Sequence, residues 1–343
     1  MSHKMPREIA PGVFWIGDCL AQRHKGKVYH GYNAAYLIAG ERASALVETG
    51  HPKDFPVIER HLAELFARGI APLKYLFVTH QETPHCGGLG RILARFPETI
   101  LCGDVSDYHL AFPQYEHRMR SMDEGDAIDL GGRSLMAVEP VIRDLRTTWW
   151  GFETRERVLF PGDGFAYSHY HLDGHCGLLA EEAVSLDLPD VSAVFADLAL
   201  FWTKFANMDA YCDRLDHLIE RLGVKTIAPT HGLPITDVKA TVPKVQEGLK
   251  AAALVPESGT NEKMIAASQR PCAKRNLPCI PSDEDSRRLI PAAQHVDSDC
   301  TAANPGCWLG KGRQRRRPRS RKLLIQIDFS NSLWGDGFNS FCA

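Results

Sequence analysis

The stretch THQETPHCGGLGRI, residues 79–92, decides how the chain is interpreted. It follows KYLFVT (74–79), a short apolar run typical of a buried strand, and it places His80, Glu82 and His85 just after that strand. Side chains at a strand end are held by rigid backbone, so they can converge with others at one edge of a sheet. Imidazole and carboxylate groups together suit zinc, iron or manganese, so the stretch predicts a metal site.

Two later stretches have the same form, a short apolar run followed by Gly or Pro and then a potential metal ligand. LFPGDGFAY (159–167) carries Asp163, and IAPTHG (227–232) carries His231. A single histidine near a strand end is usually a hydrogen-bonded or exposed side chain. Several such positions, each flanked by glycine or proline, favour one shared site instead.

Strand-like and helix-like segments alternate between these stretches. Apolar residues at helical spacing predict helices over 53–68, 88–96 and 208–222. Short apolar runs predict strands over 13–17, 33–39, 44–48, 74–79, 99–102, 134–138, 158–161 and 226–228. This alternation predicts an α/β layered fold with sheets inside and helices outside.

The composition is that of a globular protein, which excludes a collagen-like, wholly disordered or disulfide-scaffold chain. Of 343 residues, 44% are hydrophobic and 24% charged, and the formal net charge of −2 gives no reason to expect nucleic acid or an acidic membrane. No apolar run is long enough to cross a bilayer, and the start lacks the apolar core of a signal peptide, so we expect a cytoplasmic protein. We expect reduced, structural cysteines at positions 19, 86, 102, 176 and 212.

The chain is expected to divide into a folded domain over 1–255 and a basic, Cys- and Pro-containing tail over 256–343 that is mostly irregular. The tail contains the charge run GRQRRRPRSRK (312–322). A solvated segment is the favoured interpretation of this run, and nucleic-acid binding or a localisation signal is the alternative.

Taken together, the three stretches resemble the metal motifs of the metallo-β-lactamase superfamily, whose fold is a four-layer αββα sandwich. The turn VETG (47–50) is similar to the one that opens the same site, with Glu48 where the superfamily usually has Asp. Glu82 replaces the second His of the usual H-x-H-x-D-H motif, which resembles the flavodiiron and oxygen-binding diiron branch. The resemblance covers most of the predicted folded domain.

The resemblance implies one or two divalent metal ions, iron, manganese or zinc. It implies that Asp163 bridges two metals and that Asp163 and Glu82 take part in catalysis. Glu82 would make the site more negative and harder, which favours iron or manganese over zinc. The implied ligands are His80, Glu82, His85, Asp163 and His231.

Two positions depart from the family pattern. Pro84 stands where the family has an Asp ligand, and proline has no donor atom. Arg143 is the best match to a further family histidine, and its guanidinium stays cationic, so it cannot bind a metal. Arg143 could instead bind an anionic group of a substrate. Each of two metals would then keep three protein ligands, which is enough for a catalytic metal.

Two nearby segments could complete the site. The histidines of SHYHLDGH, which are His169, His171 and His175, could replace a missing ligand, although a loop with surface histidines is the favoured interpretation. Trp149 and Trp150 could wall a substrate pocket by stacking on an aromatic ring, and ordinary strand packing is the alternative.

A metal-activated water acting on a small molecule, such as an aromatic one, needs no further cofactor. A hydrolase is therefore the main interpretation. The first alternative is a non-haem diiron protein that binds or reduces dioxygen or nitric oxide with a separate electron donor, since no flavin is expected in this chain. The second is a non-catalytic partner subunit with a decayed metal site. We expect a homo- or hetero-oligomer that does not bind a membrane.

Overall fold

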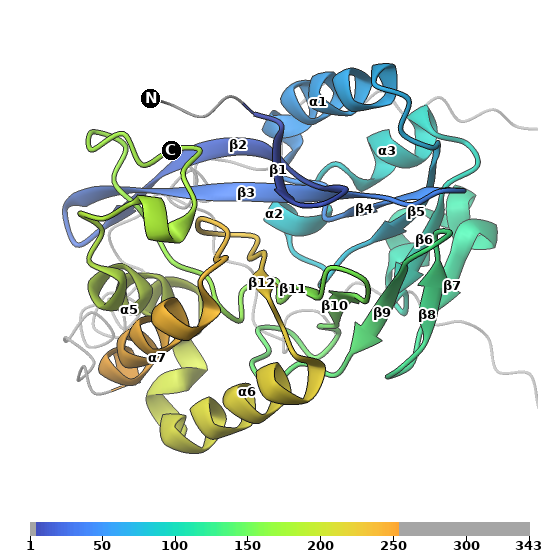
Figure 1. Cartoon of the computed structure of the whole chain (residues 1–343). Coiled ribbons are helices and arrows are strands. Elements are labelled where there is room, and N and C mark those ends of the chain that lie inside the picture. The colour runs from blue at the N-terminus through green and yellow to red at the C-terminus, as the bar shows by residue number, and fades with distance from the viewer. Residues whose placement is uncertain (1–4, 254–343) are drawn as a thin grey trace, which may run out of the picture. The chain divides into compact units, whose positions relative to one another are not determined.

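The computed structural model describes residues 5–253, so the predicted tail over 256–343 lies outside the described residues. Two β-sheets face each other (Figure 1). The first has the order β1-β2-β3-β4-β5-β6-β7, formed by Arg7–Ala10, Val13–His24, Lys27–Ala39, Ser44–Val47, Leu73–Phe77, Ile100–Gly103 and Met119–Ser121. The second has the order β12-β11-β10-β9-β8, formed by Thr226–Ile227, Val158–Phe160, Trp150–Glu153, Ser134–Val138 and Ala127–Asp129.

The side chains of the first sheet alternate between two apolar cores, as the two-residue period of a strand requires. In β2, Val13 and Trp15 point into the core shared with the second sheet. Phe14 and Ile16 point into the other core, which the helices α1 (Phe55–Ala67) and α3 (Leu89–Arg95) close. The sheet is therefore buried on both faces.

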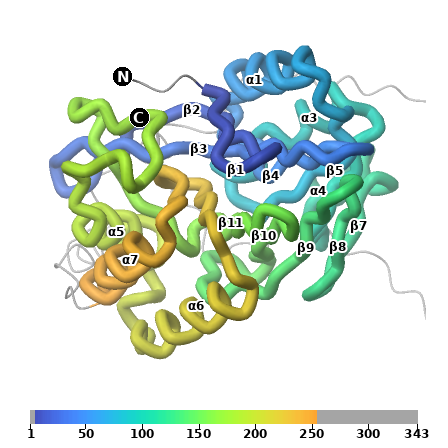
Figure 2. Tube along the Cα trace, in the orientation of Figure 1, coloured from blue at the N-terminus to red at the C-terminus, as the bar shows by residue number. Residues whose placement is uncertain are grey.

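The remaining longer helices, α5 (Leu188–Ala199), α6 (Met208–Leu222) and α7 (Val238–Ala253), lie together on the side of the second sheet (Figure 2). A Cβ atom on Gly248 of α7 would come within 2.4 Å of the Pro189 carbonyl oxygen of α5, so only glycine allows these helices to pack this closely. Short helices α2 (Thr83–Cys86) and α4 (Tyr108–Ala111) lie in the connections of the first sheet. The predicted αββα order of layers is confirmed.

The predicted helices at 53–68, 88–96 and 208–222 and the predicted strands correspond to elements of the structure. The strands β2 and β3 extend to a turn at Lys25 and Gly26, well beyond the predicted 13–17 and 33–39. From Asp18 to His24 the strand has no fully buried residue and mixes polar with apolar side chains, so its apolar pattern stops early. In residues 5–253, no helix combines the length and apolar character needed to cross a membrane.

Candidate metal centre

Strand ends position the predicted ligands. His80 follows β5, whereas Asp163 and His231 follow β11 and β12, which run parallel and so end at the same edge of their sheet. His85 lies in the short helix α2, which begins just after Glu82. The structure thus brings together side chains from segments that are far apart in the sequence.

The five predicted ligands form one cluster in which carboxylate oxygens face imidazole nitrogens. Asp163 Oδ1 lies 3.4 Å from His85 Nε2 and 3.7 Å from His231 Nε2. Glu82 Oε2 lies 3.7 Å from His80 Nε2. The three histidines and Asp163 are buried, whereas the Glu82 side chain is 51% exposed and marks the open side of the cluster.

Four buried atoms, three of the cluster and one of Asp144, which contacts His80, have no hydrogen-bond partner among the described residues. They are His80 Nε2, His85 Nε2, Asp144 Oδ1 and Asp163 Oδ1. Burying such atoms unpaired is costly, and buried polar groups in proteins are nearly always satisfied. A cation bound between them would accept their lone pairs, so the donor set fits a metal.

A separate hydrogen bond holds the other ring nitrogen of each histidine. His85 Nδ1 donates to Glu48 Oε1 over 3.1 Å, and His231 Nδ1 donates to the Tyr32 carbonyl oxygen. His80 Nδ1 lies 3.2 Å from Thr79 Oγ1. Such partners fix the ring and its tautomer in metal sites and leave Nε2 free to bind the ion.

Glu48 is the centre of this outer layer. It is buried, it accepts hydrogen bonds from the hydroxyls of Thr79 and Thr230, and it adopts a left-handed φ of 65° that non-glycine residues rarely take. Burial alone would raise the pKa of Glu48, but the neighbouring His85 lowers it below its ordinary value. The carboxylate is therefore held in its charged form next to His85.

The charges of the cluster stabilise one another. Burial would raise the pKa of Asp163, but His85 and His231 lower it below its ordinary value. Burial would lower the pKa of His85, but Asp163 and Glu48 raise it well above the ordinary value. A bound cation would take the place of the protons that His85 attracts here.

Sequence reasoning missed Asp144, which belongs to the cluster. Its Oδ2 lies 3.5 Å from His80 Nε2, and its side chain is only 9% exposed. Arg143, the expected match to the family's further histidine, instead forms an ion pair with Glu139 and is 39% exposed. The structure therefore places the carboxylate of Asp144, which can bind a metal, beside His80, whereas Arg143 pairs with Glu139. A carboxylate next to the expected position was the only signal in the sequence.

Pro84 occupies the first turn of α2, where a proline leaves no hydrogen bond of the helix unmade. The half of the cluster formed by His85, Asp163 and His231 therefore lacks the further carboxylate that the family pattern has there.

The histidines at 169–175 do not join this cluster. His175 Nε2 lies 2.8 Å from Ser185 Oγ, whereas His169 and His171 lie beside the sulfur of Cys176. His169 and His175 are buried, so the favoured interpretation of a loop with surface histidines is wrong for these two.

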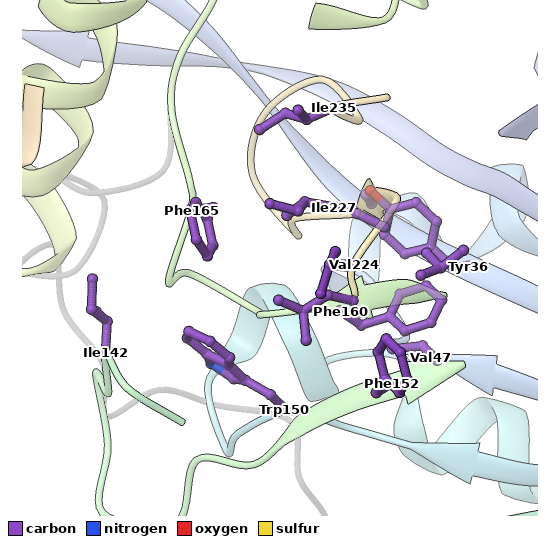
Figure 3. Close-up of a cluster of buried hydrophobic side chains, with 14 of the residues drawn as sticks. Tyr36, Val47, Ile142, Trp150, Phe152, Phe160, Phe165, Val224, Ile227 and Ile235 are labelled. Atoms are coloured by element: carbon purple, nitrogen blue, oxygen red, sulfur yellow. The ribbon is translucent and has the colours of Figure 1, made fainter. Parts of the chain in front are cut away.

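Trp150 is part of the hydrophobic core. It is fully buried, and its ring centroid lies 6.1 Å from that of Phe165 (Figure 3). A Cβ atom on Gly164 would come within 2.3 Å of its ring, so the indole packs directly under the chain that follows Asp163. The structure thus assigns Trp150 to strand packing, not to a substrate wall. Trp149 is partly buried, and its backbone N–H donates to the Thr79 carbonyl oxygen.

Residues 28–186 match the metallo-beta-lactamase superfamily. Among curated relatives, "Coenzyme F420H(2) oxidase" of Methanothermobacter marburgensis is 24% identical over 244 residues, which are 67% of this chain and 58% of the relative. "Nitric oxide reductase" of Moorella thermoacetica is 25% identical over 245 residues, which are 66% of this chain and 57% of the relative. The chain thus spans a little over half the length of these relatives.

Solved structures share the fold. Rubredoxin oxygen:oxidoreductase from Desulfovibrio gigas gives a TM-score of 0.55 at 17% identity, over 76% of this chain and 67% of that one. The flavodiiron protein from Giardia intestinalis gives a TM-score of 0.55 at 18% identity, over 73% of this chain and 61% of that one.

These findings overturn the hydrolase interpretation. The relatives named above are oxidases and nitric oxide reductases, which points to an oxidoreductase rather than to hydrolysis. Hydrolysis requires no cofactor beyond the metal, which made it the simpler prediction, whereas Glu82 in place of a histidine resembles the diiron branch. The chain carries a metallo-β-lactamase domain whose relatives and structural neighbours are flavodiiron proteins and the oxidases and nitric oxide reductases related to them.

Proposed function

We propose that this domain holds two iron ions and reduces dioxygen or nitric oxide with electrons from a separate reduced flavoprotein. The observation that carries the proposal is the buried Asp163 oxygen, which faces both His85 and His231 and has no hydrogen-bond partner in the described part of the chain. One carboxylate shared by two groups of ligands offsets the repulsion between two cations.

The ligands would divide unequally. Asp163 would be shared, His80, Glu82 and Asp144 would hold one ion, and His85 with His231 would hold the other. All donors are nitrogen or oxygen atoms, and three of the ligands are carboxylates. Such a set suits iron or manganese, whereas thiolate ligands would favour zinc. The ion with fewer protein ligands keeps more open positions, so a diatomic substrate has room there.

Two bound ferrous ions would supply redox chemistry that no side chain of the cluster can perform. The chain's own residues prepare the site. Glu48 fixes the His85 ring, and the Tyr32 carbonyl fixes His231. The ring of Phe195 lies 5.2 Å from that of His231 and keeps this side of the cluster apolar. Glu82 lies on the exposed side of the cluster, from which a substrate and protons would enter.

The overall reactions require an external donor. Reduction of dioxygen to two water molecules consumes four electrons and four protons. Reduction of two nitric oxide molecules to nitrous oxide and water consumes two electrons and two protons. No described residue can deliver these electrons repeatedly, so we assign that role to a reduced flavin on another polypeptide or segment.

The test is turnover by the protein loaded anaerobically with ferrous iron. Reduced flavin mononucleotide serves as the donor, and electrodes follow the consumption of dioxygen and, separately, of nitric oxide. We expect the iron-loaded protein to consume at least one of the gases catalytically, whereas Asp163→Asn and the metal-free protein consume neither above the rate of the flavin alone. If iron-loaded protein and metal-free protein behave alike with both gases, the proposal is wrong, and a non-catalytic role with a partner is favoured.

A further inference from the structure

A second group of metal-binding side chains lies outside the candidate metal centre. Cys19 and His30 lie on the two strands of the hairpin of β2 and β3, diagonally across from each other, with their side chains in contact. His169 and Cys176 come from the loop that follows Asp163. The backbones of His30 and His169 form a two-way bridge, with N···O distances of 2.8 and 2.7 Å, which brings the loop onto the hairpin.

The four ligand atoms of this cysteine–histidine cluster converge on one point. Cys19 Sγ lies 2.9 Å from His30 Nδ1, 3.5 Å from His169 Nε2 and 3.5 Å from Cys176 Sγ. Cys176 Sγ lies 3.3 Å from His169 Nε2. All four atoms lie within 4.8 Å of one another.

These separations approach the edges of a zinc coordination tetrahedron. Zinc bonds of about 2.3 Å to sulfur and about 2.0–2.1 Å to nitrogen give edges of about 3.8 Å between two sulfurs and about 3.5 Å between sulfur and nitrogen. The observed sulfur–sulfur distance is 3.5 Å, and three sulfur–nitrogen distances lie between 2.9 and 3.5 Å. The largest mismatch is about 0.6 Å, between Cys19 and His30, so small movements of the side chains would admit the ion.

The side chains are held in place by their surroundings. His169 is fully buried, and its ring stacks on Tyr32 with centroids 5.3 Å apart. The ring of His30 stacks on that of His171, with centroids 4.5 Å apart. Cys19, His30 and Cys176 are partly buried, so an ion can reach the group from solvent.

The chemistry of the donors distinguishes this group from the first. Two thiolates and two imidazoles form the set found in structural zinc sites, whereas the first cluster has only nitrogen and oxygen donors. A disulfide between Cys19 and Cys176 would explain the two sulfurs, but it would not explain two imidazoles directed at them. Both cysteines are free thiols in the structure.

We propose that Cys19, His30, His169 and Cys176 form a second, structural metal site that binds one zinc ion. The ion would fasten the loop after Asp163 to the hairpin of β2 and β3. Tyr32 connects the two sites, because its ring packs on His169 and its carbonyl accepts the hydrogen bond from His231. This proposal does not depend on the redox function, since it concerns different residues and a different metal.

The test begins with the full-length wild-type protein, stripped of metal under reducing conditions and titrated with Co²⁺. Tetrahedral Co²⁺ with thiolate ligands gives strong visible ligand-field bands and sulfur-to-metal charge-transfer bands, which a nitrogen and oxygen site lacks. We expect these bands to reach the intensity of one thiolate-bound Co²⁺ per chain, whatever further Co²⁺ the candidate metal centre takes up without such bands, and to disappear when zinc is added in excess.

Variants locate the site. Cys19→Ser with Cys176→Ser should abolish the charge-transfer bands and lower zinc by one ion per chain, while iron content is unchanged. Cys212→Ala, which removes a buried cysteine of α6, is the matched control and should keep the bands. If the double variant fails to fold, the zinc site is still tested by the wild-type spectrum and by His169→Gln, which removes one proposed ligand. Absence of thiolate bands in the wild type, or a Cys19–Cys176 disulfide that forms equally fast with and without zinc, would overturn the proposal.

Discussion

Asp144 Oδ2 lies 3.5 Å from His80 Nε2, and both side chains are almost completely buried. Burial, and after it the nearby Asp163 carboxylate, together raise the pKa of Asp144 to about 6. A carboxyl group with this pKa is ionised at neutral pH, and its buried charge lowers the stability of the metal-free fold. A bound cation would stabilise that charge. Asp144 therefore favours metal binding and destabilises the metal-free protein.

Asp144→Asn should therefore stabilise the metal-free protein at neutral pH. The folded-state pKa of about 6 lies above the ordinary value of 3.8, so the stability that Asp144 contributes when protonated is lost as the pH rises through about 6. The shift corresponds to at most about 3 kcal/mol. Urea unfolding of chelator-treated protein should show the gain at about pH 7.5 and little of it at about pH 4. An equal gain at both values would mean that ionisation of Asp144 is not the cause.

With iron supplied, the same substitution should have the opposite effect. Loss of a ligand carboxylate is expected to weaken binding of one iron by about tenfold or more. Arg143→Ala is the matched control, because Arg143 is the neighbouring residue and forms its ion pair with exposed Glu139. Competition with a coloured chelator measures both affinities. Weaker iron binding in Arg143→Ala than in Asp144→Asn would restore Arg143 to the site.

Glu48→Gln should weaken metal binding by about 10- to 100-fold without removing any ligand. The amide keeps a hydrogen-bond acceptor for His85 Nδ1 but loses the charge that raises the pKa of His85 and makes its ring a better ligand. Thr230→Ser keeps the hydroxyl that donates to Glu48 and serves as the control. Iron titrations of the two variants make the comparison, and unchanged affinity in Glu48→Gln would show that the carboxylate only fills space.

Pro84→Asp should strengthen binding of the more weakly held iron. The change places a carboxylate in the first turn of α2, where an acidic residue also suits the helix dipole. Pro84→Ala removes the ring without adding a donor and is the control. After exhaustive dialysis, Pro84→Asp should retain more iron than either the wild type or Pro84→Ala. Equal retention in all three proteins would indicate that position 84 does not face the ion.

The sequence predicted those parts of the structure in which a local pattern coincides with burial. The helix at Met208–Leu222 has apolar residues at regular spacing and ends at Gly223, whose left-handed φ of 57° terminates it. The strand β10 and the helix α5 were not predicted. Both depend on packing against segments distant in the chain, such as the close approach of Gly248 to Pro189.

The candidate site could be predicted only where residues stand in motifs. His80, Glu82 and His85 lie within six residues of one another, so the end of one strand brings them together. Asp144 lies in a loop whose path no spacing rule determines, and its contact with His80 is visible only in three dimensions. The cysteine–histidine cluster could not be predicted for the same reason, since Cys19 and Cys176 are 157 residues apart.

The most direct test of the account is the amount of iron bound per chain after anaerobic loading and removal of loosely bound metal. We predict two irons in the wild type and in Cys19→Ser with Cys176→Ser, and less than one in the double variant Glu82→Gln with His231→Ala, whose fold is checked by circular dichroism. Equal iron in that double variant and the wild type, or no iron in the wild type, would contradict the assignment of a diiron site.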